Sequence, residues 1–156
     1  MKITRIELIP ITVDRIYHTR VAQAGMEGDG KSGSRYVILE LMTESGFLGI
    51  GEISDLEDAW NVRSAEDLRA PYEEAVLGGE SLECRALCDR FVEILPDDTH
   101  PEMARMMTAA LEMALLDIAG KHYSVPVYEL FGGRRQDRLD VSWVAYIRGA
   151  ELLVDE

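Results

Sequence analysis

The segment ALEMALLDIAGKHYSVPVYELFGG, residues 110–133, decides the fold. It belongs to a predicted helix from about Pro101 to His122, because Thr99 and Glu102 form a capping-box pattern ahead of it. The polar residues between positions 103 and 119 are only Arg105, Thr108, Glu112 and Asp117. A helix that is apolar nearly all round is buried on two sides. We therefore expect one side to pack within this chain and the other to need a further layer.

Asp117 is a charged residue in an otherwise apolar part of this helix. It lies four residues before Lys121, so the two side chains share a helix face and can form an ion pair. A carboxylate in a mostly buried helix must be paired or hydrogen-bonded. This favours a structural role over a catalytic one. After the helix, residues 126–131 predict a short helical turn closed by Gly132 and Gly133.

The residues before this helix predict a small three-stranded antiparallel sheet followed by two helices. The β-rich opening strand is Lys2–Asp14, and a tight turn at residues 44–46 joins the other two strands. The expected elements are strands at residues 2–14, 34–43 and 47–53, and helices at residues 64–77 and 81–95. The fold class is therefore α+β.

The residues after Gly133 have a different pattern of apolar and polar residues. Arg138–Ile147 is a near-continuous apolar run, typical of a parallel strand that is covered on both faces. Residues 151–156 resemble the start of a helix. We expect a domain at residues 1–133, and at residues 134–156 the beginning of a second domain that is cut short.

The composition excludes several classes of protein. The chain has 156 residues and a formal net charge of −13. Nucleic-acid binders need a basic surface, and an acidic surface does not favour docking on an anionic membrane. No apolar run is long enough to span a membrane, and the N-terminus lacks a signal-peptide core. We expect a cytoplasmic protein without nucleic-acid or membrane partners.

The two cysteines, Cys84 and Cys88, lie four residues apart in a predicted helix and share one face. Helical geometry disfavours a disulfide between them, and two thiols without a nearby histidine are a poor zinc site. Two reduced, half-buried thiols are the favoured interpretation.

The 110–133 segment resembles the stretch that joins the capping domain to the barrel in the enolase superfamily, in its mandelate racemase/muconate lactonizing branch. The matching positions are Glu112, Ala114, Leu115, Asp117, Gly120, Lys121, Pro126, Val127, Tyr128, Leu130, Gly132 and Gly133. Earlier, residues 49–52 (GIGE) resemble the end of the third strand of the same capping domain, and the order of elements agrees over essentially the whole chain.

The resemblance implies an enolase-like N-terminal capping domain and the first strand of an incomplete (β/α) barrel. Such barrels need about 250 residues. Members abstract the proton α to a carboxylate and stabilise the enediolate with Mg²⁺, using a lysine or histidine base. The metal ligands and bases would fall beyond Glu156. We therefore assign no catalytic or metal-binding residue here, and expect the 156 residues alone to be inactive.

The linker at residues 15–35 corresponds to a lid that shapes substrate specificity in this family. It contains four glycines, and four basic residues against two acidic ones. A basic, glycine-hinged lid fits a small anionic carboxylate substrate. The candidate substrate-binding residues in it are Tyr17, His18, Arg20 and Met26. The alternative is a solvated surface loop whose basic residues offset an acidic surface.

The segment at residues 52–60 (EISDLEDAW) corresponds to a second loop near the active-site mouth. Asp55 and Trp60 are its candidate substrate-binding residues. Its four acidic side chains invite a metal-site hypothesis, but the spacing and glycine of a calcium loop are missing. A solvated acidic turn is the favoured alternative for the carboxylates, and ordinary packing is the alternative for Trp60.

Two further hypotheses remain open. The chain is either a stand-alone binding or remnant domain that hides its apolar faces in a homo-oligomer, or the cap of a barrel supplied by a separate chain. A homo-oligomer is also our expectation for the enzyme. The sequence does not select among racemisation, cycloisomerisation and dehydration, nor does it identify the acid.

Overall fold

The computed structural model describes residues 1–19, 31–54, 56 and 64–142. Its elements are β1 (Ile3–Thr19), β2 (Lys31–Thr43), β3 (Leu48–Ile53), the 3-10 helix η3 (Ala65–Leu68), α1 (Arg69–Val76), α2 (Cys84–Ile94), α3 (Pro101–Tyr123) and α4 (Val127–Leu130). The chain divides into two units, residues 1–11 with 35–134 and residues 12–34 with 135–156, and each is described by itself. No helix in the described part of the chain is long and apolar enough to cross a membrane.

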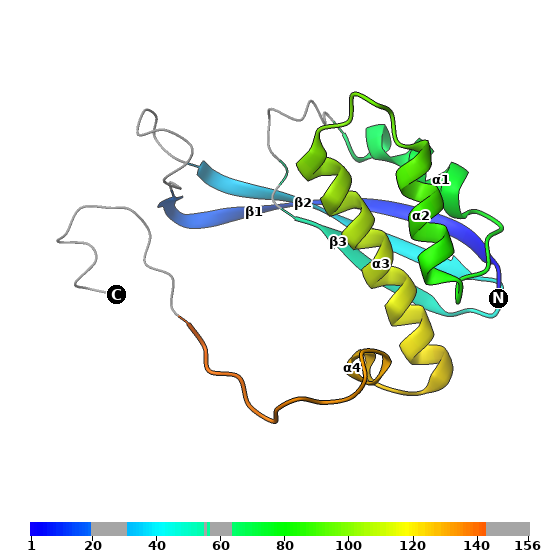
Figure 1. Ribbon diagram of the computed structural model, residues 1–156. Coiled ribbons are helices and arrows are strands. Elements are labelled where there is room, and N and C mark those ends of the chain that lie inside the picture. Colours follow the sequence, from blue (N-terminus) through cyan, green and yellow to red (C-terminus); the bar gives the residue numbers. More distant parts are fainter. Residues whose placement is uncertain (20–30, 55, 57–63, 143–156) are drawn as a thin grey trace. The chain divides into compact units, whose positions relative to one another are not determined.

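The sheet has three strands, as predicted, and their order is β1-β2-β3 (Figure 1). Strands β2 and β3 pair antiparallel, with Leu41 opposite Gly49 and Leu39 opposite Gly51. The turn between them is closed by Gly46, which has a φ of 82° and donates its N–H to the Thr43 carbonyl at 2.9 Å. A positive φ of this size is the reason for a glycine at this position.

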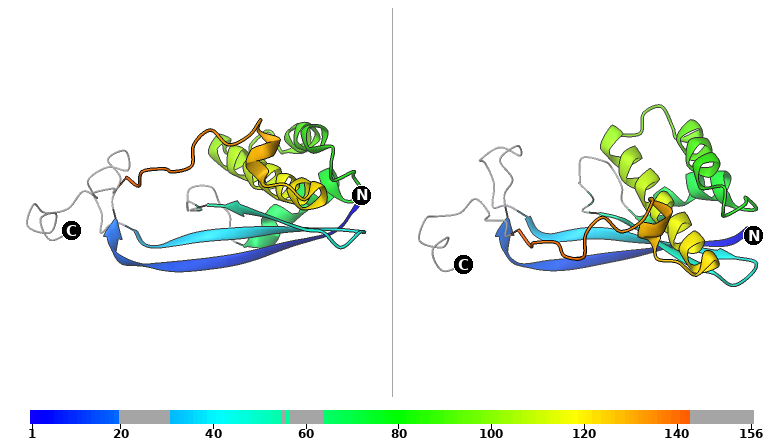
Figure 2. Two further views of the ribbon diagram at one scale, coloured as in Figure 1. Left: turned by 90° about the horizontal axis from the view of Figure 1, so that it is seen from below. Right: turned by 60° about the horizontal axis from the view of Figure 1, so that its bottom comes forward.

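The helices of the first unit cover one face of the sheet (Figure 2). Every second residue of β2 between Val37 and Leu41 is buried beneath them, as the two-residue period of a strand requires. The core also contains Leu111, Leu115 and Ile118 from α3.

The close approach of α3 to β3 depends on two glycines. A Cβ built on Gly51 would lie 1.9 Å from the carbonyl oxygen of Ala110, and one on Gly49 would lie 2.2 Å from that of Ala114. The helix backbone therefore occupies the space that side chains at positions 49 and 51 would need. The GIGE motif thus has a structural reason, which is contact between β3 and α3.

Three elements of the helical layer meet at Tyr72. Its ring stacks on Phe91 with the centroids 4.7 Å apart, and its hydroxyl donates to the Met107 carbonyl at 2.8 Å. Both aromatic side chains are fully buried. Tyr72 therefore joins α1 to α2 by stacking and to α3 by a hydrogen bond.

We expect Tyr72→Phe to lower the free energy of unfolding by about 1 kcal/mol near neutral pH, because a buried hydrogen bond is lost. Burial raises the pKa of Tyr72 well above its ordinary value. A raised native pKa gives stability that is complete below about pH 10, where an unfolded tyrosine begins to ionise, and that is lost above it. The difference between the two proteins should therefore shrink as the pH rises above about 10. Urea unfolding at neutral and alkaline pH checks this, and a constant difference would contradict it.

The structure corrects several predicted boundaries. Strand β1 continues to Thr19 and β2 begins at Lys31, so much of the expected 15–35 linker is strand. Helix α2 begins at Cys84 and not at Ser81, whose N–H instead bonds to the Met1 carbonyl. The predicted Thr99–Glu102 capping box is wrong. His100 is the N-cap of α3, and its Nδ1 accepts the Glu102 N–H at 3.2 Å.

Ser64 and Asp67 form a capping box ahead of η3. The strand expected at residues 138–147 is not present in the part of that range that the structure describes. Residues 138–142 have no regular secondary structure, and residues 143–147 lie outside the described part of the chain, as do residues 151–156. The short helical turn after α3 is α4, and it is followed by positive φ angles at Gly132 and Gly133.

Candidate functional site

The sequence places the candidate site in two loops, and the structure describes their edges. Tyr17 and His18 belong to the last residues of β1. Arg20 and Met26 lie in the segment between β1 and β2, and Asp55 and Trp60 in the segment after β3, all outside the described residues. These six residues remain predictions.

Hydrogen bonds attach the beginning of the second loop, residues 52–60, to β2. The Leu56 N–H donates to the Arg35 carbonyl at 2.8 Å, and the Arg35 guanidinium donates to the Leu56 carbonyl at 3.4 Å. The Leu56 side chain is buried against the core. Leu56 is therefore a packing residue, which was one of the two roles open to an apolar residue in this loop.

Asp117 and Lys121 form the expected ion pair, with the Lys121 Nζ and the Asp117 Oδ2 2.7 Å apart. The same Oδ2 accepts the Ile50 N–H at 3.1 Å, and the Lys121 Nζ donates to the Leu48 carbonyl at 2.6 Å. Among the described strands β3 lies at the edge of the sheet, so these two backbone groups have no partner in them. The pair therefore closes the free edge of the sheet, which is a structural role.

We expect Asp117→Ala to lower the free energy of unfolding by about 1–2 kcal/mol, because the Ile50 N–H and the Lys121 ammonium both lose a partner. Asp117→Asn should cost less, since its amide oxygen still accepts the Ile50 N–H. Urea unfolding measures the loss, and faster hydrogen exchange at the Ile50 amide locates it. Glu112→Gln, at an exposed carboxylate on the same helix, is the control. An unchanged Ile50 exchange rate in Asp117→Ala would contradict the assignment.

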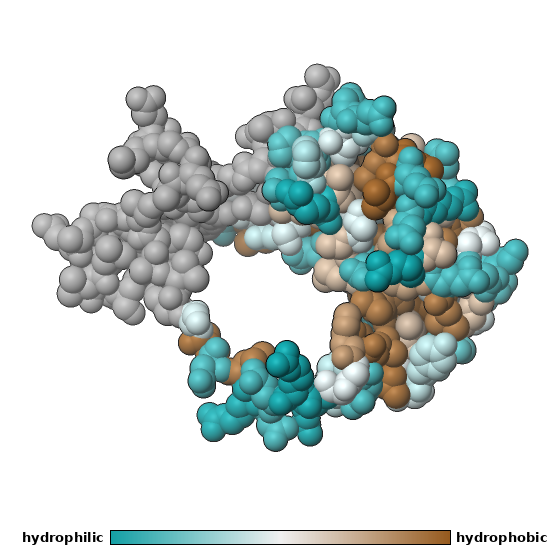
Figure 3. Space-filling model, viewed as in Figure 1, coloured by the Kyte–Doolittle hydropathy of each residue, from teal (hydrophilic) through white to brown (hydrophobic). Residues whose placement is uncertain are grey.

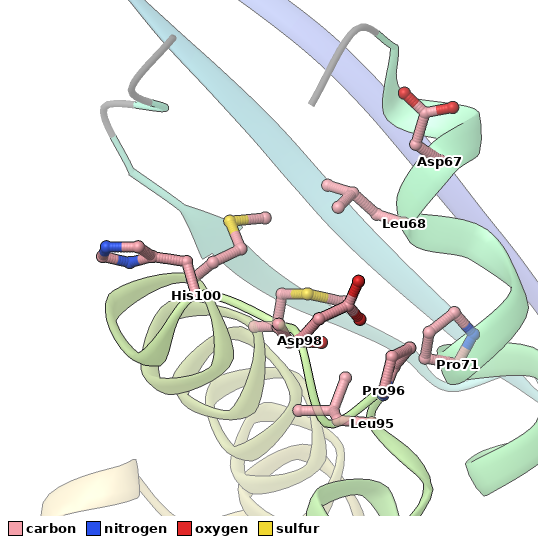
Figure 4. A pocket seen from close by; sticks show the side chains of 10 residues that line it. Asp67, Leu68, Pro71, Leu95, Pro96, Asp98 and His100 are labelled. Carbon is pink, nitrogen blue, oxygen red and sulfur yellow. The ribbon is translucent and has the colours of Figure 1, made fainter. Parts of the chain in front are cut away.

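A cavity of about 270 Å³ opens where η3 and α1 face the connection between α2 and α3 (Figure 4). Leu68, Pro71 and Leu95 are among its apolar walls. Two of its polar residues serve helix caps: Asp67 accepts the Ser64 N–H, and His100 caps α3. Residue spacing along the sequence does not indicate this cavity, because its lining comes from three separate segments.

An apolar surface remains exposed along α3 and continues onto α4. We call it the apolar ridge; it comprises the half-buried Leu116 and the exposed Ala109, Met113, Val127, Leu130 and Phe131. Met113 is 50% exposed and Phe131 is 70% exposed. Apolar side chains gather over this part of α3 in the space-filling view (Figure 3). The ridge is the side of the helix for which the sequence predicted a further layer.

The comparisons with known proteins agree with this architecture. The family model for the mandelate racemase / muconate lactonizing enzyme N-terminal domain matches residues 13–132. The chain is 32% identical over 127 residues to a chloromuconate cycloisomerase from Cupriavidus pinatubonensis, covering 77% of this chain and 32% of the relative. It is 32% identical over 124 residues to a D-galactonate dehydratase from Variovorax paradoxus, covering 78% of this chain and 31% of the relative.

Solved structures share the fold. The N-succinyl Arg/Lys racemase from Bacillus cereus superposes with a TM-score of 0.78 at 25% identity, over 99% of this chain and 40% of the other. A 2-chloromuconate cycloisomerase from Rhodococcus opacus superposes with a TM-score of 0.80 at 20% identity, over 99% of this chain and 40% of the other. A dipeptide epimerase from Cytophaga hutchinsonii, complexed with Mg and a dipeptide, gives 0.79 at 19% identity, over 99% of this chain and 40% of the other.

These relatives are isomerases and lyases, and this chain spans about a third of the length of the two curated relatives named above. The sheet, the helical layer and the family match over residues 13–132 lead to one conclusion. The chain belongs to the mandelate racemase/muconate lactonizing enzyme N-terminal domain family of the enolase superfamily, and its fold is that family's capping domain.

Proposed function

We propose that this chain is the capping and specificity portion of a Mg²⁺-dependent enzyme that abstracts the proton α to a carboxylate. The reaction is a racemisation or other isomerisation, a cycloisomerisation, or a dehydration of an acid sugar. The observation that carries the proposal is the family match over residues 13–132. The relatives named above include cycloisomerases, a dehydratase, a racemase and an epimerase.

The catalytic groups of this enzyme lie outside these 156 residues, in a (β/α) barrel. Among the described residues, no three His, Cys, Asp or Glu side chains come together in a way that could hold a metal ion. Residues of the barrel would hold Mg²⁺, which would supply positive charge for the anion that forms when the α-proton is removed. We expect the apolar ridge to be covered by that barrel, because a large exposed apolar surface marks an interface.

The contribution of this chain is to select and enclose the substrate. Arg20 and His18 are proposed to face the substrate carboxylate, which positive side chains bind by charge-assisted hydrogen bonds. Tyr17, Met26 and Trp60 are proposed to supply apolar walls, and Asp55 a polar contact. The Arg35–Leu56 hydrogen bonds support this arrangement, because they fix the start of the second loop to the strand that follows the first.

The proposal is tested by hydrogen–deuterium exchange at the α-carbon in D₂O, using the protein with its barrel. The panel consists of N-succinyl amino acids, dipeptides, a muconolactone and acid sugars. We expect exchange with one of these classes, and we expect it to require Mg²⁺. Exchange that survives removal of the metal, or no exchange across the whole panel, would count against the proposal.

The exposed ridge also favours a second candidate, a non-catalytic domain that buries its apolar residues in a homo-oligomer. Light scattering of the 156-residue chain over a range of concentrations separates the two. A stable oligomer that Met113→Glu dissociates favours the second candidate, and a monomer argues against it. Glu93→Gln, on the exposed part of α2, serves as the control.

A further inference from the structure

Cys84 and Cys88 form a dithiol that neither the fold nor the proposed function uses. Both thiols are reduced and partly exposed, and they lie one helical turn apart on α2. They are also the only two cysteines of the chain. Two side chains at positions i and i+4 of a helix lie on the same face, so their sulfur atoms point into the same space.

That space is a cavity of about 300 Å³ between α2 and α3. Both cysteines line it, together with Arg85 and Asp89 from α2 and Thr108 and Glu112 from α3. The cavity is large enough for a group bound to both sulfur atoms. Its two carboxylates outnumber its one guanidinium, so the cavity disfavours anionic reagents such as free thiolates and admits neutral or cationic ones.

The Cys88 thiol lowers the pKa of the Cys84 thiol, and the Cys84 thiol, together with burial, raises the pKa of Cys88. Cys84 is also the first residue of α2, where the helix dipole favours a thiolate. One sulfur is therefore the better nucleophile, and the second is held beside it.

The geometry points to a site where both sulfur atoms bind one soft, thiophilic centre, with trivalent arsenicals as the ligand class. The Cys84 thiolate attacks the arsenic of a monosubstituted arsenous acid, R–As(OH)₂, and one hydroxyl leaves as water. The Cys88 sulfur then displaces the second hydroxyl, again as water. Two As–S bonds replace two As–O bonds, both thiol protons end in water, and no oxidant or reductant is needed.

This site differs from the two usual fates of a cysteine pair. A disulfide would require the helix to distort, whereas an arsenic atom bridges two sulfur atoms that stay on their helix face. Zinc requires four ligands in a structural site. An arsenical of this kind needs only the two thiolates that the helix already places together.

The test is a titration of the 156-residue chain with phenylarsine oxide, followed by intact mass under native conditions. We expect one phenylarsenic group per chain, retained against excess glutathione and released by ethanedithiol. Cys84→Ser and Cys88→Ser should each hold it roughly 100-fold more weakly, because the second bond is intramolecular and gains a high effective concentration.

The matched control keeps two thiols but moves one off the shared face. Cys88→Ser combined with Asp89→Cys places the thiols five residues apart, and we expect it to behave like the single-cysteine variants. Circular dichroism establishes that each variant is folded. The inference is overturned if a single-cysteine variant retains the group as tightly as the parent, if the control does so, or if the parent reacts only after unfolding. The outcome is independent of the enzymatic proposal, because no substrate or barrel is involved.

Discussion

Gly51→Ala is expected to lower the free energy of unfolding by about 3 kcal/mol, at the upper end of the cost of overpacking. The added methyl would lie 1.9 Å from the Ala110 carbonyl oxygen and 2.7 Å from the Ala110 carbonyl carbon. Both atoms belong to the backbone of α3, so no side chain can rotate to relieve the contact. The helix must move away from the sheet, and its buried residues lose packing along β3. Urea denaturation of the 156-residue chain measures the effect.

Gly46→Ala is the matched control for this substitution. Gly46 has a positive φ, but a Cβ built on it meets nothing within 4 Å. Its replacement therefore carries only the conformational cost of a side chain in the left-handed region, about 1 kcal/mol. If Gly51→Ala costs no more than Gly46→Ala, the close contact between α3 and β3 is not what requires glycine there.

The second large effect concerns the proposed lid. We expect the double variant Arg20→Gln and Lys31→Gln, in the protein with its barrel, to lower kcat/KM for an anionic substrate about 30-fold. This corresponds to a loss of about 2 kcal/mol, the contribution of a hydrogen bond between charged groups. Arg20 is proposed to bind the carboxylate, and Lys31 is a further basic residue of the linker at residues 15–35. Because neither is proposed to move the α-proton, the change should fall mainly on KM. Steady-state kinetics of the exchanging substrate measures it.

The control for charge neutralises two arginines outside the lid. Arg135→Gln with Arg138→Gln changes the net charge by the same amount, and both residues are exposed. We expect the control to leave kcat/KM within about twofold of the parent value, since neither residue is proposed to contact the substrate and exposed charges are screened at physiological salt. Equal losses in the two double variants would assign the effect to net charge and would remove the lid from the account.

Much of the fold follows from local patterns in the sequence. The alternation of apolar residues in β2, the turn at Gly46 and the apolar run of α3 each specify one element, and these predictions were confirmed. The pairing of Asp117 with Lys121 was also predictable, because four residues along a helix fix which side chains meet. Its second partner, the free edge of β3, depends on tertiary packing and was not predictable from spacing.

The errors have a common physical origin. The Thr99–Glu102 pattern satisfied the rule for a capping box, but His100 supplied the cap because the chain enters the helix one residue later. The linker was predicted from its glycines as a loop from residue 15, whereas sheet pairing continues the strand to Thr19. Tertiary contacts override local preference at such ends. The cavity at His100 and the Cys84–Cys88 cavity arise between separate helices, so sequence spacing alone indicates neither.

The most direct test of the whole account measures α-proton exchange by two preparations, each with and without Mg²⁺. One is the 156-residue chain alone, and the other is the same chain joined to the barrel that we propose for it. If the chain contributes substrate selection but no catalytic group, only the joined protein exchanges the α-proton, and only with the metal. Mg²⁺-dependent exchange by the 156-residue chain alone would contradict the account.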